Sequence, residues 1–179
     1  RVYWQEGGEE RSRLFANIAS FGVSALVSKA VNDSSKRFGG LVSFAAATLK
    51  ANLSYRRHQV RFLTDGAASG PTVDLTVGAC CVGRYFGGGM QVGPEADPSD
   101  GLLDVVALTI KPWDMLQMPR IYRGTHLSMS NARCWRASEL AAEVVGDGTC
   151  YIEADGEVFG SLPARFESVP AAFRMKIVG

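Results

Sequence analysis

The most informative part of this chain is residues 83–90, GRYFGGGM, followed at residues 95–105 by EADPSDGLLDV. The three glycines at 87–89 allow the backbone to approach another segment or a ligand where a Cβ atom would clash. The acidic turn after them places Asp97 and Asp100 where carboxylates and main-chain carbonyls could converge on a hard cation. This stretch therefore predicts a glycine loop, an acidic turn and then a strand.

Length and composition favour one soluble globular domain, residues 1–179. Hydrophobic residues make up 46% of the chain, charged residues 21%, and the net charge is +1. No block of like charge is present, so composition gives no support to a nucleic-acid partner. The longest apolar run, residues 41–49, is too short to cross a bilayer. The chain begins with Arg1 and has no visible signal peptide, so we expect a piece of a longer protein.

The four cysteines are expected to be structural. Cys80 and Cys81 are neighbours, and neighbouring residues of a strand point to opposite faces, so they cannot share one partner. No spacing of cysteine and histidine indicates a zinc site. With Cys134 and Cys150, they are predicted to be buried, reduced thiols of a cytoplasmic protein.

The order of predicted elements favours a mainly β protein of the α+β class. Helical periodicity is found at residues 24–31, at about residues 40–53, and from Pro112 to residue 121. Residues 1–13 are predicted to form a strand and a loop. Further strands are predicted at residues 14–20, 59–63, 72–82, 102–110 and 172–178, with alternating strand segments within residues 132–145 and a hairpin at residues 151–159. Many strands with two or three helices indicate an antiparallel β-sandwich without linker or repeat.

The sequence Asp155-Gly156-Glu157 lies between two apolar strand segments. Spacing alone favours a two-residue hairpin turn, because Asp-Gly suits two positions of positive φ. The alternative is a catalytic role for the two carboxylates, which spacing alone favours less. The residues by themselves leave both interpretations open.

Three other features are given structural interpretations. The glycine loop lacks the helix N-terminus and the lysine of a P-loop, so it is not predicted to hold phosphate. The sequence GDGT at residues 146–149 is interpreted as a turn. His126 is interpreted as a hydrogen-bonded structural histidine.

Taken in order, the RYFGGGM and DGLLDV segments and the later DGE resemble the lipid kinase family that includes bacterial diacylglycerol kinases and eukaryotic sphingosine kinases. The corresponding family segment reads close to NGRYFGGGM, then DGLLDV. The resemblance extends from residues 15–22 to residues 160–166. It implies that the chain is the second, C-terminal β-sandwich domain of a two-domain lipid kinase whose ATP-binding domain precedes it.

The resemblance also implies roles for individual residues. Glu157 corresponds to the proposed base that takes the proton from the lipid hydroxyl, and Asp155 faces the nucleotide phosphates and the metal. Asp97, Asp100 and Leu102 match positions that hold Mg²⁺ in bacterial members, through one carboxylate, main-chain carbonyls and water. ATP would be the co-substrate, bound mainly by the N-terminal domain.

The glycine loop is predicted to lie on the lipid side of the site. Its candidate residues are Arg84, Tyr85, Gly87, Gly88 and Gly89. Two departures from the family pattern stand out. Val82 replaces the usual asparagine, and Ser24 and Leu26 lie where related enzymes often carry an aspartate. In sphingosine kinases such a carboxylate recognises the amine of the lipid, so a sphingoid base loses an expected partner here.

The expected function is the lipid-binding and base-supplying half of an ATP-dependent lipid kinase, acting on a diacylglycerol- or sphingoid-type hydroxyl. Its expected partners are the lipid, a membrane surface on which it acts peripherally, and the N-terminal domain. The chain alone is expected to fold but to show no kinase activity. Two alternatives stay open: a non-catalytic lipid-binding or interaction module derived from such a kinase, and an unrelated sandwich for hydrophobic ligands.

Overall fold

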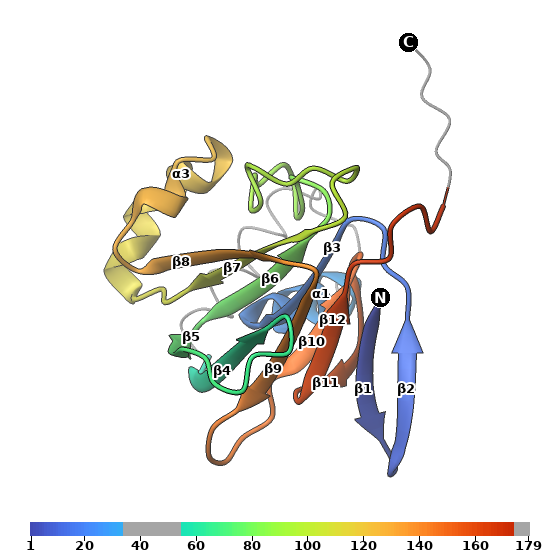
Figure 1. The fold of residues 1–179 in the computed structure, drawn as a ribbon. Helices are drawn as coiled ribbons and strands as arrows, with labels where there is room; N and C mark the ends of the chain where they lie inside the picture. The colour runs from blue at the N-terminus through green and yellow to red at the C-terminus, as the bar shows by residue number, and fades with distance from the viewer. Residues whose placement is uncertain (34–54, 174–179) are drawn as a thin grey trace.

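The computed structural model describes residues 1–33 and 55–173, which form two packed six-stranded antiparallel sheets (Figure 1). The strands of sheet A are β1 (Val2–Glu6), β2 (Glu9–Arg13), β4 (His58–Thr64), β5 (Thr72–Leu75), β9 (Glu139–Val144) and β12 (Ala164–Glu167), in the order β2-β1-β12-β9-β4-β5. The strands of sheet B are β3 (Ile18–Gly22), β6 (Val77–Cys81), β7 (Leu103–Leu108), β8 (Ala132–Ala137), β10 (Tyr151–Ala154) and β11 (Glu157–Ser161), in the order β11-β10-β3-β6-β7-β8. The predicted antiparallel β-sandwich is confirmed.

Among the described residues, helices are few and lie outside the sheets. They are α1 (Val23–Asp33), the 3-10 helix η1 (Pro112–Gln117), α3 (Pro119–Tyr122) and the 3-10 helix η2 (His126–Ser128). The helix predicted at residues 24–31 is confirmed as α1. The single helix predicted from Pro112 is wrong: it is divided because Pro119 lacks an N–H donor and begins a new helix. The helix predicted at residues 40–53 lies outside the described residues. None of the helices in the described ranges is long and apolar enough to cross a bilayer.

The main core lies between the two sheets. Its centre is aromatic, with the Phe21 ring 5.5 Å from that of Phe166 and 5.9 Å from that of Phe62. All three side chains are at most 1% exposed. Truncation of one such phenylalanine to alanine costs about 3–5 kcal/mol, so this cluster holds the sheets together.

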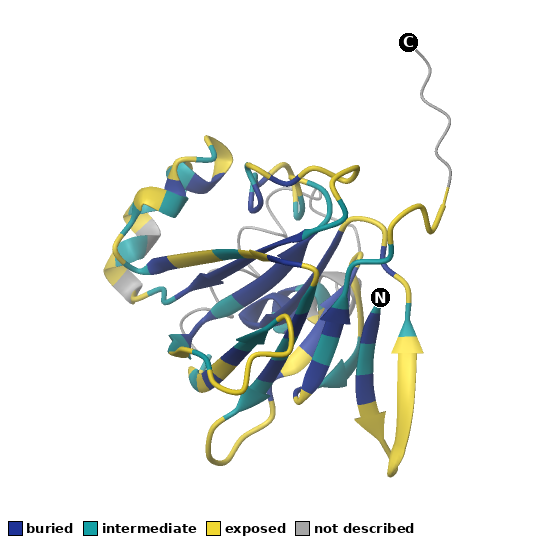
Figure 2. Cartoon of the chain, viewed as in Figure 1, coloured by how far each residue is buried: buried dark blue, intermediate teal, exposed yellow. Residues whose placement is uncertain are grey.

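The central strands of sheet B are buried on both faces. Every residue of β3 and β7 is buried, as the dark strands of Figure 2 show. Cys80 points into the core between the sheets and Cys81 into a second apolar cluster, so the predicted opposite faces are confirmed. This second cluster covers the outer face of sheet B, and it contains the candidate site.

Two regions predicted to be extended are each divided between the sheets. The segment at residues 72–82 becomes β5 and β6, and the segment at residues 132–145 becomes β8 and β9. At the first break the N–H of Thr76 donates to the Leu108 carbonyl at 2.9 Å, and the Thr76 carbonyl accepts from Val23 at 2.9 Å. At the second, the N–H of Ser138 donates to the Asp65 carboxylate. Alternation of apolar residues continues across such corners, so the sequence pattern did not reveal them.

Four further predictions are corrected. The loop expected within residues 1–13 is strand β2, paired with β1 in a hairpin. The strand expected at residues 14–20 begins only at Ile18. A closing strand was expected at residues 172–178, but the two of these residues that are described are not in a sheet. The last described strand is β12, which pairs with β1 and β9 in sheet A. Cys134 is exposed, because its side of the edge strand β8 faces solvent.

Candidate active site

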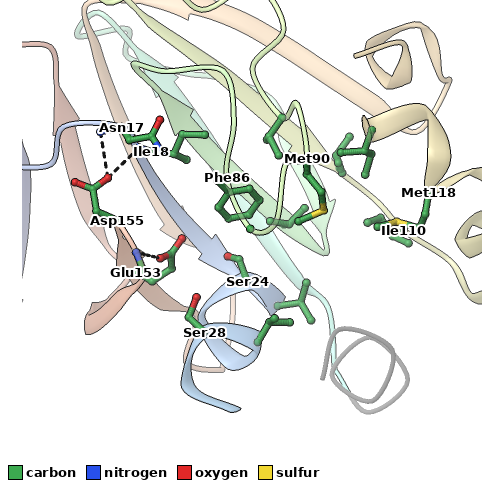
Figure 3. Close-up of a pocket in the computed structure, with 18 residues that line it drawn as sticks. Asn17, Ile18, Ser24, Ser28, Phe86, Met90, Ile110, Met118, Glu153 and Asp155 are labelled. Atoms are coloured by element: carbon green, nitrogen blue, oxygen red, sulfur yellow. Dashed lines mark hydrogen bonds between the residues drawn. The ribbon is translucent and has the colours of Figure 1, made fainter. Parts of the chain in front are cut away.

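A cavity of about 440 Å³ lies on the outer face of sheet B (Figure 3). Its floor comes from the sheet and its walls from α1, the glycine loop and the segment around α3. Apolar side chains dominate the lining, among them Ile18, Val27, Val77, Met90, Leu108 and Ile121. This volume and this apolar character are typical of small-molecule sites.

The glycine loop closes one wall of the cavity. Phe86 and Met90 exchange two backbone hydrogen bonds of 3.0 Å, so the three glycines between them form a tight turn. Their φ angles are 54°, 76° and 94°, in the left-handed region that glycine adopts without strain. Phe86, Gly87 and Met90 all line the cavity (Figure 3). The three glycines therefore shape the wall.

The other predicted lipid-side residues lie elsewhere. Arg84 donates from Nε to the Ala96 carbonyl at 3.0 Å. Tyr85 is 53% exposed, and its carbonyl accepts a 2.9 Å hydrogen bond from Asn17. Neither these two residues nor Gly88 and Gly89 belong to the described lining of the cavity. Of the five candidates, Gly87 is the one that reaches it.

Asp155 forms the turn between β10 and β11 and also borders the cavity. Its φ is 50° and that of Gly156 is 90°, as the Asp-Gly hairpin interpretation predicted. The Asp155 carboxylate accepts hydrogen bonds from three successive backbone amides, those of Ala16 at 2.8 Å and of Asn17 and Ile18 at 3.1 Å. The side chain is thereby fixed at the exposed edge of the cavity (Figure 3).

Glu157, two residues on, has a different environment. It is the first residue of β11, its side chain is 66% exposed, and its carboxylate is ion-paired with Arg13. The Arg13 guanidinium in turn lies over the Phe159 ring at 5.3 Å. Glu157 is not among the described residues that line the cavity. The structure thus separates the two carboxylates of the motif into one that borders the cavity and one that faces solvent.

Sequence reasoning missed a third carboxyl group, Glu153. It is 1% exposed and lines the cavity. Its Oε2 accepts from the Gly156 amide at 3.0 Å, and its Oε1 contacts the Ser20 hydroxyl. Burial raises the pKa of Glu153, the two hydrogen bonds oppose that rise, and the Asp155 charge adds to it. The sequence signal was a glutamate on the solvent-side alternation of β10, but only the structure reveals that this face is covered.

The predicted metal residues lie in a loop before β7. Asp97 Oδ1 accepts from the hydroxyl of Ser99 at 2.6 Å and from its amide at 2.9 Å, which lowers the Asp97 pKa. Asp100 Oδ1 accepts from the Leu102 amide at 2.8 Å, and its other oxygen is ion-paired with Arg136.

A sparsely coordinated Mg²⁺ at this loop stays a prediction. In the part of the chain that the structure describes, no group of three acidic, histidine or cysteine side chains could hold a metal. A cation would depend on the Asp100 carboxylate, main-chain carbonyls and water, which Mg²⁺ accepts, and it would compete with Arg136. Nearby, Asp104 Oδ2 is buried with no hydrogen-bond partner among the described residues.

Two other predicted features have the expected settings. His126 is 1% exposed, and its Nε2 hydrogen-bonds the Val92 carbonyl at 3.2 Å. The GDGT sequence at residues 146–149 lies in the loop between β9 and β10, remote in the chain from any helix of the described residues.

Comparison with known proteins identifies relatives among lipid kinases. Residues 17–177 match the family described as the YegS C-terminal NAD kinase beta sandwich-like domain. The chain is 31% identical over 166 residues to a diacylglycerol kinase of Mycobacterium tuberculosis (strain ATCC 25618 / H37Rv), covering 90% of this chain and 51% of that protein. It is 27% identical over 162 residues to a probable lipid kinase YegS-like protein of Shewanella frigidimarina, covering 89% and 51%.

The fold also matches crystal structures from Bacillus anthracis str. Sterne. A candidate diacylglycerol kinase gives a TM-score of 0.61 at 17% identity, over 94% of this chain and 53% of the other. A diacylglycerol kinase gives 0.53 at 14% identity, over 92% and 48%. The chain spans about half the length of the curated relatives it matches. It belongs to the diacylglycerol kinase/YegS lipid kinase family, as a C-terminal β-sandwich domain of that family.

Proposed function

We propose that this chain is the lipid-binding half of an ATP-dependent kinase that phosphorylates a diacylglycerol- or sphingoid-type hydroxyl. One observation carries the proposal: Asp155, fixed by three backbone amides, borders a cavity with mostly apolar walls. Apolar walls suit aliphatic chains, while a fixed polar group at the edge suits the polar end of the same molecule. The relatives named diacylglycerol kinase support this substrate class.

In the proposed reaction, the lipid hydroxyl attacks the γ-phosphorus of ATP, its proton passes to the Glu157 carboxylate, and ADP leaves. Glu157 must separate from Arg13 to accept that proton, which its exposed position permits. Asp155 keeps its orientation and lies toward the nucleotide. Asp97, Asp100 and Leu102 would hold a Mg²⁺, whose charge would neutralise charge on the phosphates. The nucleotide itself would bind mainly to the N-terminal domain that such kinases carry.

The membrane surface is proposed as the source of the lipid. The segment from η1 to α3 exposes Trp113 by 65%, Leu116 by 87% and Tyr122 by 44%. Residues 111–123 contain three basic residues and one acidic residue, which suits an anionic bilayer. Other side chains of this segment, including Met118 and Ile121, line the cavity, so one short segment would link the bilayer to the cavity. We infer peripheral binding in the cytoplasm.

The test is ATP-dependent lipid phosphorylation by the complete protein that contains this domain. Glu157→Gln keeps the shape of the side chain and removes the base, so kcat should fall by about 100-fold or more. Glu10→Gln, the same change on the exposed strand β2, should leave kcat unchanged. Undiminished turnover of Glu157→Gln would remove the base assignment. Phosphorylation by the 179-residue chain alone would contradict the proposal that the N-terminal domain binds the nucleotide.

A non-catalytic lipid-binding module is the second candidate function. The observation that favours it is the ion pair of Glu157 with Arg13, outside the described lining of the cavity. In that case the chain binds lipid, the complete protein transfers no phosphate, and Glu157→Gln changes neither property. Measurement of lipid binding and of phosphate transfer by the complete protein and by its Glu157→Gln variant separates the two candidate functions.

A further inference from the structure

A chain of polar groups runs into the apolar cavity from beneath. Glu153 Oε1 contacts the Ser20 hydroxyl, and the Ser20 hydroxyl lies 2.7 Å from that of Ser24. Ser24 and Glu153 both line the cavity, and Ser28, one helical turn further along α1, lines it too (Figure 3). These hydrogen-bonded side chains join α1 to β10 through β3. They are separate from the amides that anchor Asp155.

The number of hydroxyl hydrogens fixes the direction of these hydrogen bonds. Ser20 has one hydroxyl hydrogen and two neighbours, so it donates to one of them and accepts from the other. When Glu153 is ionised, Ser20 donates to Glu153 and Ser24 donates to Ser20. The lone pairs of Ser24 then remain to accept a hydrogen bond from within the cavity. The second oxygen of Glu153 already accepts from the Gly156 amide.

The charges around the cavity favour the same kind of ligand. Two carboxyl groups, those of Glu153 and Asp155, belong to the described lining, and no lysine or arginine does. A ligand that brings an anion would meet unbalanced negative charge. A hydroxyl or ammonium group would instead satisfy the acceptors and favour the ionised form of Glu153.

We propose that Glu153, Ser20 and Ser24 form a second polar subsite of the cavity, which receives a hydrogen-bond donor of the lipid other than the hydroxyl held near Asp155. Ser24 makes the contact, and Glu153 acts through Ser20 as a positioning residue. The subsite rests on the proposed function, and it ranks the substrates. Lipids with a second donor, such as monoacylglycerols and amino-alcohol lipids, bind more tightly than diacylglycerols, whose ester groups only accept hydrogen bonds.

The experiment measures binding without ATP, by calorimetric titration of the 179-residue chain with a monoacylglycerol, a diacylglycerol and a fatty acid of matched acyl chain. The wild type should bind the monoacylglycerol most tightly and the anionic fatty acid most weakly. Glu153→Gln places an amide donor beside Ser20. The direction of the hydrogen bonds is then reversed: Ser20 donates to Ser24, and the Ser24 hydroxyl donates into the cavity. This variant and Ser24→Ala should each weaken monoacylglycerol binding about tenfold and diacylglycerol binding less than twofold.

Glu10→Gln is the matched control, since it makes the same chemical change on exposed strand β2. Equal loss of both lipids in both variants, or no loss, overturns the subsite while lipid binding itself stands. Ser24→Ala decides the matter if Glu153→Gln fails to fold. A wild-type chain that binds none of the three lipids overturns the proposed function together with the subsite.

Discussion

The molecule contains two Asp-Gly turns built in nearly the same way, one at the end of β4 in sheet A and one between β10 and β11 in sheet B. Asp65 and Asp155 both have φ of 50° and are both followed by a glycine of positive φ. Asp65 Oδ1 accepts from the amides of Ser138 at 2.9 Å and Glu139 at 3.0 Å, and also from the Ser138 hydroxyl. Asp155 accepts from three amides of the segment before β3.

The surroundings of the two turns differ. Asp65 ties the corner between β8 and β9 to β4, and it is not among the described residues that line the 440 Å³ cavity. Asp155 borders the 440 Å³ cavity and lies between Glu153 and Glu157 in sequence. An aspartate anchored by backbone amides is therefore a structural feature by which this fold holds a turn against a neighbouring segment. The cavity and the neighbouring carboxyl groups are what distinguish the candidate site.

The largest expected difference between the turns is in catalysis. Asp155→Asn and Asp65→Asn each weaken hydrogen bonds to amides, and asparagine tolerates positive φ, so each should lower the midpoint of thermal unfolding by a few degrees. In the complete protein, only Asp155→Asn should reduce lipid phosphorylation, by about 100-fold. Equal activities for the two variants would mean that the Asp155 turn is as purely structural as its counterpart.

Exposed apolar side chains of η1 and of the loop after β9 offer the next comparison. Trp113→Ser combined with Leu116→Ser should weaken binding to anionic lipid vesicles by about tenfold, because both side chains would leave water on binding. Val145→Ser, after β9 of sheet A, removes a side chain that is 40% exposed and should have no effect. Vesicle sedimentation provides the measurement. The membrane assignment fails if both proteins bind alike, or if another part of the protein covers Trp113 so that the wild type does not bind.

Two carboxyl groups should give opposite responses to pH. Hydrogen bonds from Ser138 lower the Asp65 pKa below 3.8, so its stabilisation is present above that pH and is lost as pH falls through the folded value. Burial raises the Glu153 pKa above 4.5, so its contribution is present below that pH and is lost as pH rises through the folded value.

Chemical denaturation across pH checks both signs. Relative to the wild type, Glu153→Gln should gain unfolding free energy as the pH rises from 4.5 to neutrality. Asp65→Asn should lose stability at neutral pH and approach the wild type in acid. A gain that is the same at all pH values would exclude titration of Glu153 as its cause.

The smallest expected effect is that of Mg²⁺ on the loop before β7. Mg²⁺ should raise the unfolding midpoint of the wild type by one or two degrees, since a sparse site binds weakly. Asp100→Asn should remove this increase, whereas Asp147→Asn, in the loop between β9 and β10, should retain it. Retention of the increase by Asp100→Asn would place the metal elsewhere.

The sandwich was predictable because the alternation of apolar residues at β4 and the mostly apolar run at β7 are local signals. The division of strands at Thr76 and Ser138 was not, since a corner needs only a local change of backbone partners. The Asp-Gly turn followed from residue type alone. The burial of Glu153 did not, because it depends on α1 and the glycine loop covering the outer face of sheet B, and that contact is remote in sequence. The Arg13–Glu157 pair is likewise a contact between distant strands.

The central claim is that the lipid occupies the cavity on the outer face of sheet B, with its hydroxyl near Asp155. The most direct measurement is a crystal structure of the chain with a monoacylglycerol. We predict an acyl chain between Phe86, Met90 and Ile121, one hydroxyl oxygen near Asp155, and the second hydroxyl within hydrogen-bond distance of Ser24. A lipid bound on sheet A, in the groove beside Tyr3 and Arg165, would contradict it.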